Sequence, residues 1–373
     1  MNLLITCPPG LAQICKQELL YLWYKSQVIS PTSLIISDTT AKDMINLNLR
    51  LRTANKVFLI LDRSQITTFD ELFDFISKQE RSDRVHNQQP ILVEASTHKS
   101  QLTSLPSIQS IVKKALTAKL TGDKEIPRVE NKGMTEFAVT LMLHENIALL
   151  LINSTGEWLH RRGYRTDTGE APLKENIAAG LVLDSGRRFS QPLYDICCGS
   201  GTICIEAALI AKNIAPWLLR DFAFQSRKGY KSTIFEEAKE QAKAKQIQKP
   251  HTIFWSDIDP EVITKAKANA KNAGLDDDAI LFEVKDCKEY SLSVFNIQPC
   301  ALISNPPYGQ RMQQSDIADI HRHLFSLFEA EESKLSGGIF TGNKLIQPTN
   351  PRLREEKKLK NGAEEVVLWK RKS

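Results

Sequence analysis

The chain has 373 residues, of which 42% are hydrophobic and 25% charged, so it can form two or three globular domains. No apolar run approaches the roughly 20 residues of a transmembrane helix, and the first residues lack the basic start of a signal peptide, which predicts a cytoplasmic protein. The net charge of +5 permits an anionic partner without requiring one. The seven cysteines lack paired CxxC spacing, so neither a disulfide framework nor a metal site is predicted.

The first part of the chain, up to about Leu151, carries short strand-like segments separated by helical ones, which predicts an α+β half. Strands are expected at 3–7, 33–37, 56–61, 91–96, 137–143 and 147–152. A helix is expected over 104–120, where apolar residues share one face and lysines lie off it. The polar, glycine-containing residues that follow this half are typical of a linker.

Beyond the linker, strand-like segments at 192–198, 252–258, 279–286 and 300–307 alternate with helical ones. This alternation is the signature of an α/β fold with a mostly parallel, doubly wound sheet. Near the end of the chain, Asn361 and Gly362 mark a turn into a last strand.

The stretch LYDICCGSGTICIEAALIA runs from a strand that ends at Asp195, through a glycine turn, into a helix. Gly199 and Gly201 let the backbone approach a ligand, which the free N–H groups of the new helix would face. A generic turn is the alternative. A dinucleotide site is disfavoured because Cys204 stands where a third glycine is expected, and a P-loop is disfavoured because GKS or GKT is missing. The pattern DxxxGxGT resembles motif I of S-adenosylmethionine-dependent methyltransferases.

Two further acids follow the next two predicted strands. Asp257 can accept both hydroxyls of a ribose, with Ile258 packing on an adenine, although Asp257 could instead cap the next helix. Asp259 is the better cap candidate because Pro260 follows it. Asp286 could accept a hydrogen bond from the adenine amino group, since the ends of parallel strands, and the acids that follow them, meet at one edge of such a sheet. The predicted cofactor contacts are Asp195, Cys197, Gly199, Ser200, Gly201, Thr202, Asp257, Ile258, Asp286, Cys287 and Asn305.

The fourth strand of this half ends in the sequence Asn305, Pro306, Pro307 and Tyr308, which we predict to be catalytic. This tetrapeptide resembles motif IV of methyltransferases that modify amino groups conjugated to a ring or an amide. The lone pair of such a nitrogen is delocalised, so the nitrogen attacks poorly until acceptors pull on its N–H groups. The side-chain oxygen of Asn305 and the carbonyl of Pro306 can be those acceptors, and Tyr308 can stack on a flipped base.

Basic residues exceed acidic ones between Lys99 and Lys132, and several more follow between His160 and Arg165. Such side chains can bind RNA phosphates, or can form an ordinary solvated face. The predicted RNA contacts are Lys99, Lys113, Arg128, Arg161, Arg162 and Arg165.

Taken together, these motifs resemble the THUMP-domain RNA guanine-N2 methyltransferases, the family of RlmL-, YpsC- and TrmN-like proteins. The resemblance also covers residues 7–20, 47–61, 95–116, 155–165, 170–183, 213–224 and 305–312. It implies a ferredoxin-like domain at 1–50, a THUMP RNA-binding domain at 51–154, a linker at 155–170 and a Rossmann-like methyltransferase domain at 171–373. The last domain would contain a seven-stranded sheet with an antiparallel last strand.

The implied activity is methyl transfer from S-adenosylmethionine to the N2 amino group of a guanine in ribosomal or transfer RNA. No obligate protein partner and no membrane are predicted. An adenine-N6 methyltransferase, a non-catalytic RNA-binding protein and a nicotinamide oxidoreductase are the alternatives. The intact Asn305, Gly199 and Gly201 argue against a non-catalytic protein, and the missing third glycine argues against an oxidoreductase.

Overall fold

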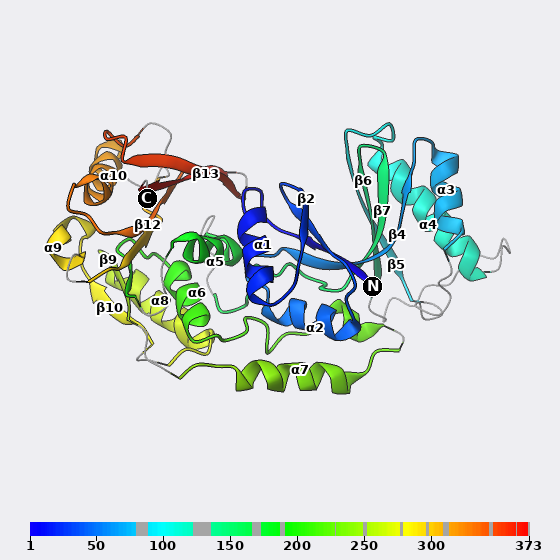
Figure 1. The fold of residues 1–373 in the computed structure, drawn as a ribbon, viewed down its shortest axis with the longest axis horizontal. Helices are drawn as coiled ribbons and strands as arrows, with labels where there is room; N and C mark the ends of the chain where they lie inside the picture. Colours follow the sequence, from blue (N-terminus) through cyan, green and yellow to red (C-terminus); the bar gives the residue numbers. More distant parts are fainter. Residues whose placement is uncertain are drawn as a thin grey trace.

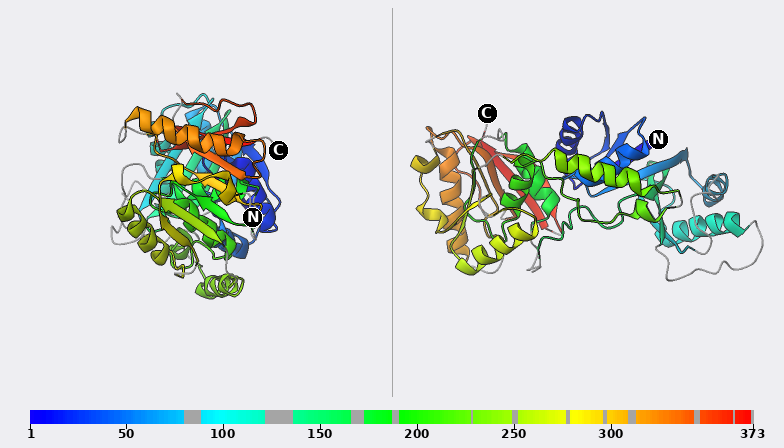
Figure 2. Two further views of the ribbon diagram at one scale, coloured as in Figure 1. Left: turned by 90° about the vertical axis from the view of Figure 1, so that its left-hand side faces the viewer. Right: turned by 90° about the horizontal axis from the view of Figure 1, so that it is seen from below.

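The protein forms two seven-stranded sheets along the axis of an elongated molecule (Figures 1 and 2). The computed structural model describes residues 1–79, 89–121, 136–165, 173–186, 191–227, 229–248, 252–276, 279–295, 298–308, 313–342, 346–362 and 364–371. The predicted RNA contact Arg128 lies outside these residues. Each helix in the described part of the chain is too short or too polar to cross a lipid bilayer.

The first sheet has the strand order β2-β3-β1-β4-β7-β6-β5, in which only β5 and β6 run parallel. Its strands are β1 (Asn2–Thr6), β2 (Gln27–Ser30), β3 (Ser33–Ile36), β4 (Lys56–Gln65), β5 (Ile91–His98), β6 (Phe137–His144) and β7 (Ile147–Asn153). Helices α1 (Ala12–Tyr21) and α2 (Ala41–Arg50) pack near β1 and β3, whereas α3 (Phe69–Ser77) and α4 (Leu105–Thr121) pack near β5 to β7.

Strand β4 joins the two parts of this sheet. It pairs with β1 over residues 56–60 and with β7 from Phe58 to Gln65. The segments proposed as ferredoxin-like and THUMP domains therefore share one continuous sheet. Each still has its own hydrophobic core, one beside β1 and β3 and the other beside β5 to β7. We keep the division as a proposal, with β4 as its common element.

The second sheet has the order β10-β9-β8-β11-β12-β14-β13. Its strands are β8 (Leu193–Asp195), β9 (Ile253–Asp257), β10 (Leu281–Val284), β11 (Ala301–Ser304), β12 (Ser336–Thr341), β13 (Leu353–Asn361) and β14 (Glu364–Arg371). The strands from β10 to β12 are parallel, and β14 is antiparallel to both of its neighbours. The predicted mostly parallel sheet with an antiparallel last strand is confirmed.

Helices cover both faces of the second sheet. One hydrophobic core holds side chains of α5 (Glu175–Asp184), α6 (Thr202–Ala211) and α8 (Pro260–Asn272), and another holds those of α9 (Leu292–Phe295) and α10 (Gln314–Glu329). Because the sheet is buried between two helical layers, its polar groups gather at the strand ends, where a ligand can reach them.

The two halves of the molecule pack against each other through α1 and α7 (Ser232–Ala244). Leu11 and Ile14, at the start of α1, enter the core that contains α5 and α6. From the C-terminal half, Phe235 and Ala238 of α7 enter the core beside β1 and β3. Figure 1 shows α7 running beneath α2. The C-terminal half therefore extends back across the part that contains β1 and β3.

The described part of the predicted linker, residues 155–165, is packed into the protein. The Thr155 hydroxyl donates a hydrogen bond to the side-chain oxygen of Asn48 (2.7 Å). Leu159 and Tyr164 expose 0% and 3% of their surfaces. These three side chains anchor the segment, whose polar composition is typical of a linker, between the two halves.

Candidate active site

The candidate site lies at the carboxyl edge of the second sheet, where β9 and β11 flank β8. The chain leaves β8 toward β9 on one side, and β11 joins β8 from the other side, so the strand order reverses at this point. Ligands of open α/β sheets bind at such a reversal. The glycine turn after β8 and the tetrapeptide after β11 both begin there.

The glycine turn needs both of its glycines, for different reasons. Gly201 precedes α6 with a φ of 80°, and a Cβ on it would lie 1.9 Å from the Trp255 ring, so no other residue fits. Gly199 has a φ of 51°, and a Cβ there would meet no atom within 4 Å. Gly201 therefore packs the turn against β9, while Gly199 leaves open space beside the α6 N-terminus.

Asp257 ties the end of β9 to this turn. One carboxylate oxygen accepts a hydrogen bond from the Gly199 N–H (3.0 Å) and the other accepts one from the Asp259 N–H (3.2 Å). Burial raises the pKa of Asp257, and these N–H donors oppose the shift. Asp259 is the cap of α8, as predicted, because it accepts the Glu261 N–H (2.8 Å). The neighbouring Ile258 side chain is 65% exposed, so an apolar surface lies next to the carboxylate.

Asp195 links the glycine turn to the tetrapeptide. Its carboxylate is buried and accepts hydrogen bonds from the Ser304 hydroxyl (2.9 Å) and the Cys197 N–H (3.3 Å). Burial raises its pKa to about 7. The two hydrogen bonds oppose this shift, whereas the negative charge of Asp257 adds to it. Ser304 is the last residue of β11, so Asp195 fixes the point from which Asn305 projects.

Asn305 carries a feature that calls for a ligand. Its side-chain oxygen is buried, yet it accepts no hydrogen bond from any described residue. A buried acceptor without a donor costs about 1–3 kcal/mol. That cost is recovered if a bound molecule donates an N–H at this position.

The rest of the tetrapeptide sits partly inside the protein. Pro306 is buried and Pro307 is exposed. The Tyr308 ring lies close to Gly342 after β12, where a Cβ on the glycine would come within 2.8 Å of two ring carbons. Burial raises the pKa of the Tyr308 phenol, and the carboxylate of Glu364 adds to the effect. The ring is thus half-buried and held in place.

Asp286 and Cys287 follow β10 at the same edge. Asp286 accepts the Lys288 N–H (2.9 Å) and caps a short turn, and its side chain is 26% exposed. Cys287 is buried next to Cys197, and a hydrogen bond between the two thiols raises the pKa of Cys197. The two cysteines pack the end of β10 against the glycine turn that follows β8.

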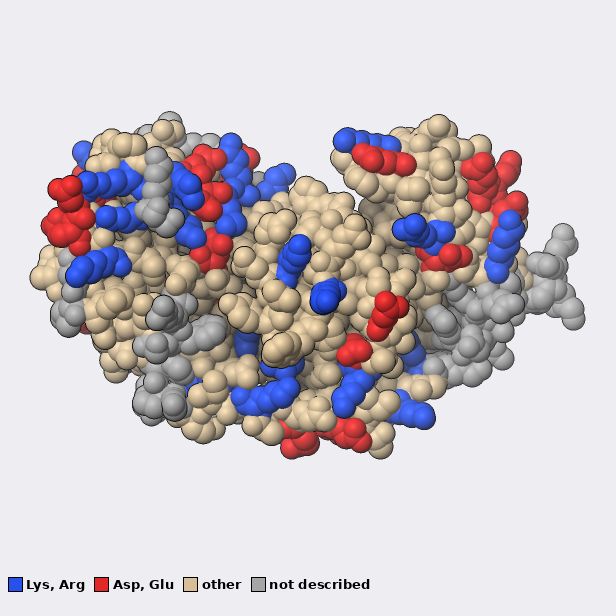
Figure 3. All heavy atoms as spheres, viewed as in Figure 1, with Lys and Arg blue, Asp and Glu red and all other residues tan. Residues whose placement is uncertain are grey.

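The predicted RNA contacts divide into buried and exposed residues. Arg162 and Arg165 form buried ion pairs with Glu206 (3.1 Å) and Glu175 (2.8 Å), so these two arginines support the fold and do not present their charge to RNA. Lys99 is exposed and lies 3.7 Å from the Glu145 carboxylate. Lys113 and Arg161 are exposed. On the face drawn in Figure 3, basic side chains are mixed with acidic ones and form no single basic field.

Three important residues of this half escaped prediction. Trp255 shapes the glycine turn, Ser304 holds Asp195, and Glu206 pairs with Arg162. Glu206 had a visible signal, because it is the one charged residue in the apolar helix TICIEAALIA. An acid in such a position needs a buried cationic partner.

Comparison of the sequence with known families identifies the family of the chain. The model UPF0020, described as RMKL-like, methyltransferase domain, matches residues 162–358, and the RlmL ferredoxin-like domain matches residues 2–58. The chain belongs to the RMKL-like methyltransferase family. The resemblance to RlmL- and YpsC-like methyltransferases and the expected S-adenosylmethionine dependence are thereby confirmed.

Two curated relatives and one solved structure show how far the similarity extends. YpsC of Bacillus subtilis, provisionally named an RNA methyltransferase, is 34% identical over 332 residues, covering 88% of this chain and 84% of YpsC. The ribosomal RNA large subunit methyltransferase K/L of Alteromonas mediterranea is 33% identical over 322 residues, covering 83% of this chain and 45% of that protein. The crystal structure of SMU.472 complexed with SAH has a TM-score of 0.86 and 30% identity, covering 99% of this chain and 97% of that one. The chain thus spans about half the length of the K/L relative.

The residues at the sheet edge fit S-adenosylmethionine. The open space at Gly199 and the N-terminus of α6 would receive its polar end. Asp257 has lone pairs left for ribose hydroxyls, and the exposed Ile258 offers an apolar contact for adenine. Asn305 lies at the end of β11, beside this space in the sheet order.

Asp257→Ala is expected to weaken the binding of S-adenosylhomocysteine by about 1–3 kcal/mol, because the ribose hydroxyls lose their acceptors. Isothermal titration calorimetry measures the change. Asp259→Ala is the matched control: it removes the α8 cap, costs about 1 kcal/mol of stability and leaves the affinity intact. Equal affinities for wild type and Asp257→Ala, with an intact fold, would show that Asp257 only supports the turn.

Proposed function

We propose that this protein transfers a methyl group from S-adenosylmethionine to the exocyclic N2 amino group of a guanine in structured RNA. The observation that carries the proposal is the buried, unpartnered side-chain oxygen of Asn305 at the cofactor edge. The cofactor supplies an electrophilic methyl group on a sulfonium. The protein's task is to present a weakly nucleophilic nitrogen to it.

Asn305 suits that task because its oxygen can accept an N–H of the amino group. Accepting this hydrogen bond pulls the N–H out of the plane of the base, which makes the nitrogen more tetrahedral and localises its lone pair. The hydrogen bond from the Ser304 hydroxyl to Asp195 holds the preceding strand end, so the acceptor is fixed before the base arrives. Tyr308 then provides an aromatic surface next to the amino group.

The choice of RNA rests on the names of the relatives and on the exposed basic residues of the N-terminal half. YpsC and the K/L protein are named for RNA and for large-subunit ribosomal RNA. Lys113 on α4 and Arg161 are exposed in this chain. We propose that residues 1–154, together with Arg161, hold the RNA through its phosphates.

Methylation of purified RNA by the full-length protein tests the function. Ribosomal and transfer RNA from a strain lacking the gene would be incubated with methyl-labelled S-adenosylmethionine, then digested and analysed as nucleosides by mass spectrometry. The expected product is N2-methylguanosine. N6-methyladenosine would support the adenine alternative, and a methyl on a ring carbon or a ribose would contradict the role of Asn305. Absence of any transfer despite cofactor binding would indicate a non-catalytic RNA-binding protein.

A further inference from the structure

A second site lies far along the chain from the catalytic tetrapeptide, at the end of α1. Helix α1 closes with two hydrogen bonds, from the Trp23 N–H to the Leu20 carbonyl (2.9 Å) and from the Tyr24 N–H to the Leu19 carbonyl (2.9 Å). This pattern places Trp23 in the left-handed position that usually holds glycine, and its φ is 69°. A bulky residue there costs about 1–2 kcal/mol relative to glycine. The backbone would thus be more stable without this side chain.

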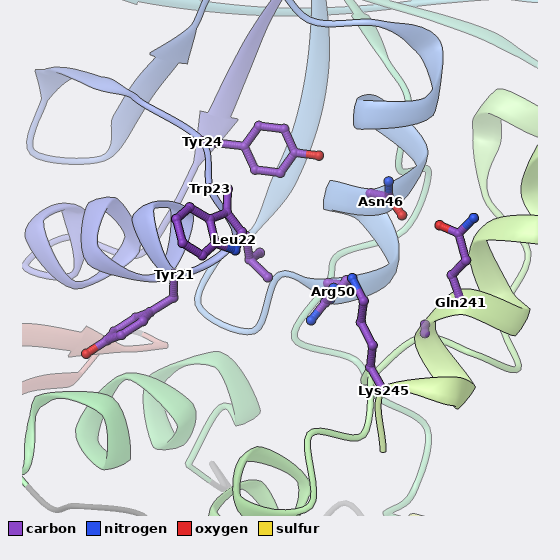
Figure 4. Close-up of a pocket in the computed structure, with 9 residues that line it drawn as sticks. Tyr21, Leu22, Trp23, Tyr24, Asn46, Arg50, Gln241 and Lys245 are labelled. Carbon is purple, nitrogen blue, oxygen red and sulfur yellow. The ribbon is translucent and has the colours of Figure 1, made fainter. Parts of the chain in front are cut away.

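The Trp23 side chain recovers none of that cost by packing. It is 93% exposed, and Tyr21 beside it is 77% exposed. Large aromatic side chains at such exposure in a folded domain indicate an interaction surface. Figure 4 shows the Trp23 indole at the rim of a hollow, with the Tyr21 ring pointing away from it.

The hollow has a volume of about 330 Å³ and lies on the seam between the two halves. Its lining consists of Tyr21, Leu22, Trp23, Tyr24, Asn46, Arg50, Gln241, Ala242 and Lys245. The first six belong to the part that matches the RlmL ferredoxin-like domain, and the last three belong to the part that matches the methyltransferase domain. A molecule bound here would touch both.

The charge of the lining favours an anion. Arg50 and Lys245 are its charged residues, and neither forms an ion pair with any residue that the structure describes. Both lie at helix ends, Arg50 as the last residue of α2 and Lys245 directly after α7. Cations at such positions also interact with the helix dipole, so they indicate a ligand only together with the exposed indole.

An aromatic ring, two cations and two side-chain amides form the usual contacts for an unpaired nucleotide. The base stacks on the ring, the phosphate pairs with the cations, and amides such as those of Asn46 and Gln241 can bond base edges. The nine lining residues include two cations and no carboxylate, and this charge favours a polyanion such as RNA over a protein surface of mixed charge.

We propose that this hollow binds an unpaired nucleotide of the RNA substrate, with its base on Trp23 and its phosphate between Arg50 and Lys245. The proposal rests on the proposed function, because it assigns to that RNA a second contact outside the catalytic edge. Since both halves of the protein line the hollow, a nucleotide held there would fix the RNA relative to the catalytic half.

The test uses full-length protein and a fluorescein-labelled, single-stranded oligouridylate, with affinity measured by fluorescence anisotropy. Trp23→Gly should weaken binding by about 5- to 150-fold, the range for loss of one base stack, while the melting temperature stays equal or rises. Trp23→Phe, which keeps a ring, should retain most of the affinity. Lys245→Ala should reduce the slope of log affinity against log salt by about one.

Lys243→Ala is the matched control, because Lys243 lies on the same helix and pairs with Glu240 (2.8 Å) outside the hollow. It should leave the affinity unchanged. If Trp23→Gly binds the probe as wild type does, and methylates RNA with an unchanged KM, the inference is wrong while the proposed function stands. If wild-type protein neither binds RNA nor methylates it, both fail.

Discussion

Asn305→Ala is expected to slow methyl transfer to RNA by about 10²- to 10³-fold, the usual cost of removing one preorganised hydrogen-bonding group from a reacting centre. The affinity for S-adenosylhomocysteine should change little, because the loss concerns the nucleophile. The melting temperature should hold as well, since the removed oxygen has no donor among the described residues. Single-turnover transfer of a labelled methyl group, together with calorimetry, measures these quantities.

Tyr308→Phe is the control for this prediction. It keeps the ring that lies near Gly342 and removes only the hydroxyl, so transfer should fall mildly. A wild-type rate in Asn305→Ala would show that the buried oxygen does not orient the amino group. A lost affinity for S-adenosylhomocysteine would instead assign Asn305 to cofactor binding alone.

The sequence allowed much of the candidate site to be predicted, because parallel strands bring their carboxyl ends together at one edge of the sheet. Asp195, Asp257 and Asn305 each follow an apolar run, and alternating helices predict that these runs are neighbours in one sheet. The cap of α8 at Asp259 was equally predictable, since it depends on residues next to it in the chain.

Side-chain burial was harder to predict, because it depends on contacts between distant segments. Arg161 and Arg162 are adjacent and identical in chemistry, yet Arg161 is exposed and Arg162 is enclosed. The difference comes from Glu206, 44 residues further along the chain. Local charge counts therefore included two arginines, Arg162 and Arg165, that belong to the interior, and the RNA-binding role of the exposed ones stays a prediction.

Strand β2 and the hollow at Trp23 were missed for related reasons. Gln27–Ser30 offers only a short alternating pattern, and its pairing with β3 becomes evident only in the folded sheet. In the sequence, Trp23 is one of several aromatic residues at the end of an amphipathic helix. Its left-handed backbone and its exposure are properties of the fold alone.

The buried pair of Arg162 and Glu206 connects the two halves and leads to the largest expected change in stability. The guanidinium lies 3.1 Å from one Glu206 oxygen, and also donates to the Arg52 carbonyl (2.6 Å) in the N-terminal half. The Tyr164 hydroxyl donates to the same carboxylate (3.3 Å). Burial lowers the pKa of Arg162, but the charge of Glu206, its hydrogen bond and the charge of Glu175 together outweigh burial, so the net shift is upward and the guanidinium stays protonated.

Arg162→Ala is therefore expected to lower the free energy of unfolding by about 3–5 kcal/mol, because it leaves the Glu206 carboxylate buried without its cation. Chemical denaturation followed by tryptophan fluorescence measures the loss. The double variant Arg162→Met with Glu206→Leu removes both charges and should recover most of it. Arg161→Ala, one residue away and exposed, should change stability by less than about 0.5 kcal/mol while weakening RNA binding. Equal stability losses at the two positions would mean that the ion pair does not hold the halves together and that the segment's backbone carries the junction.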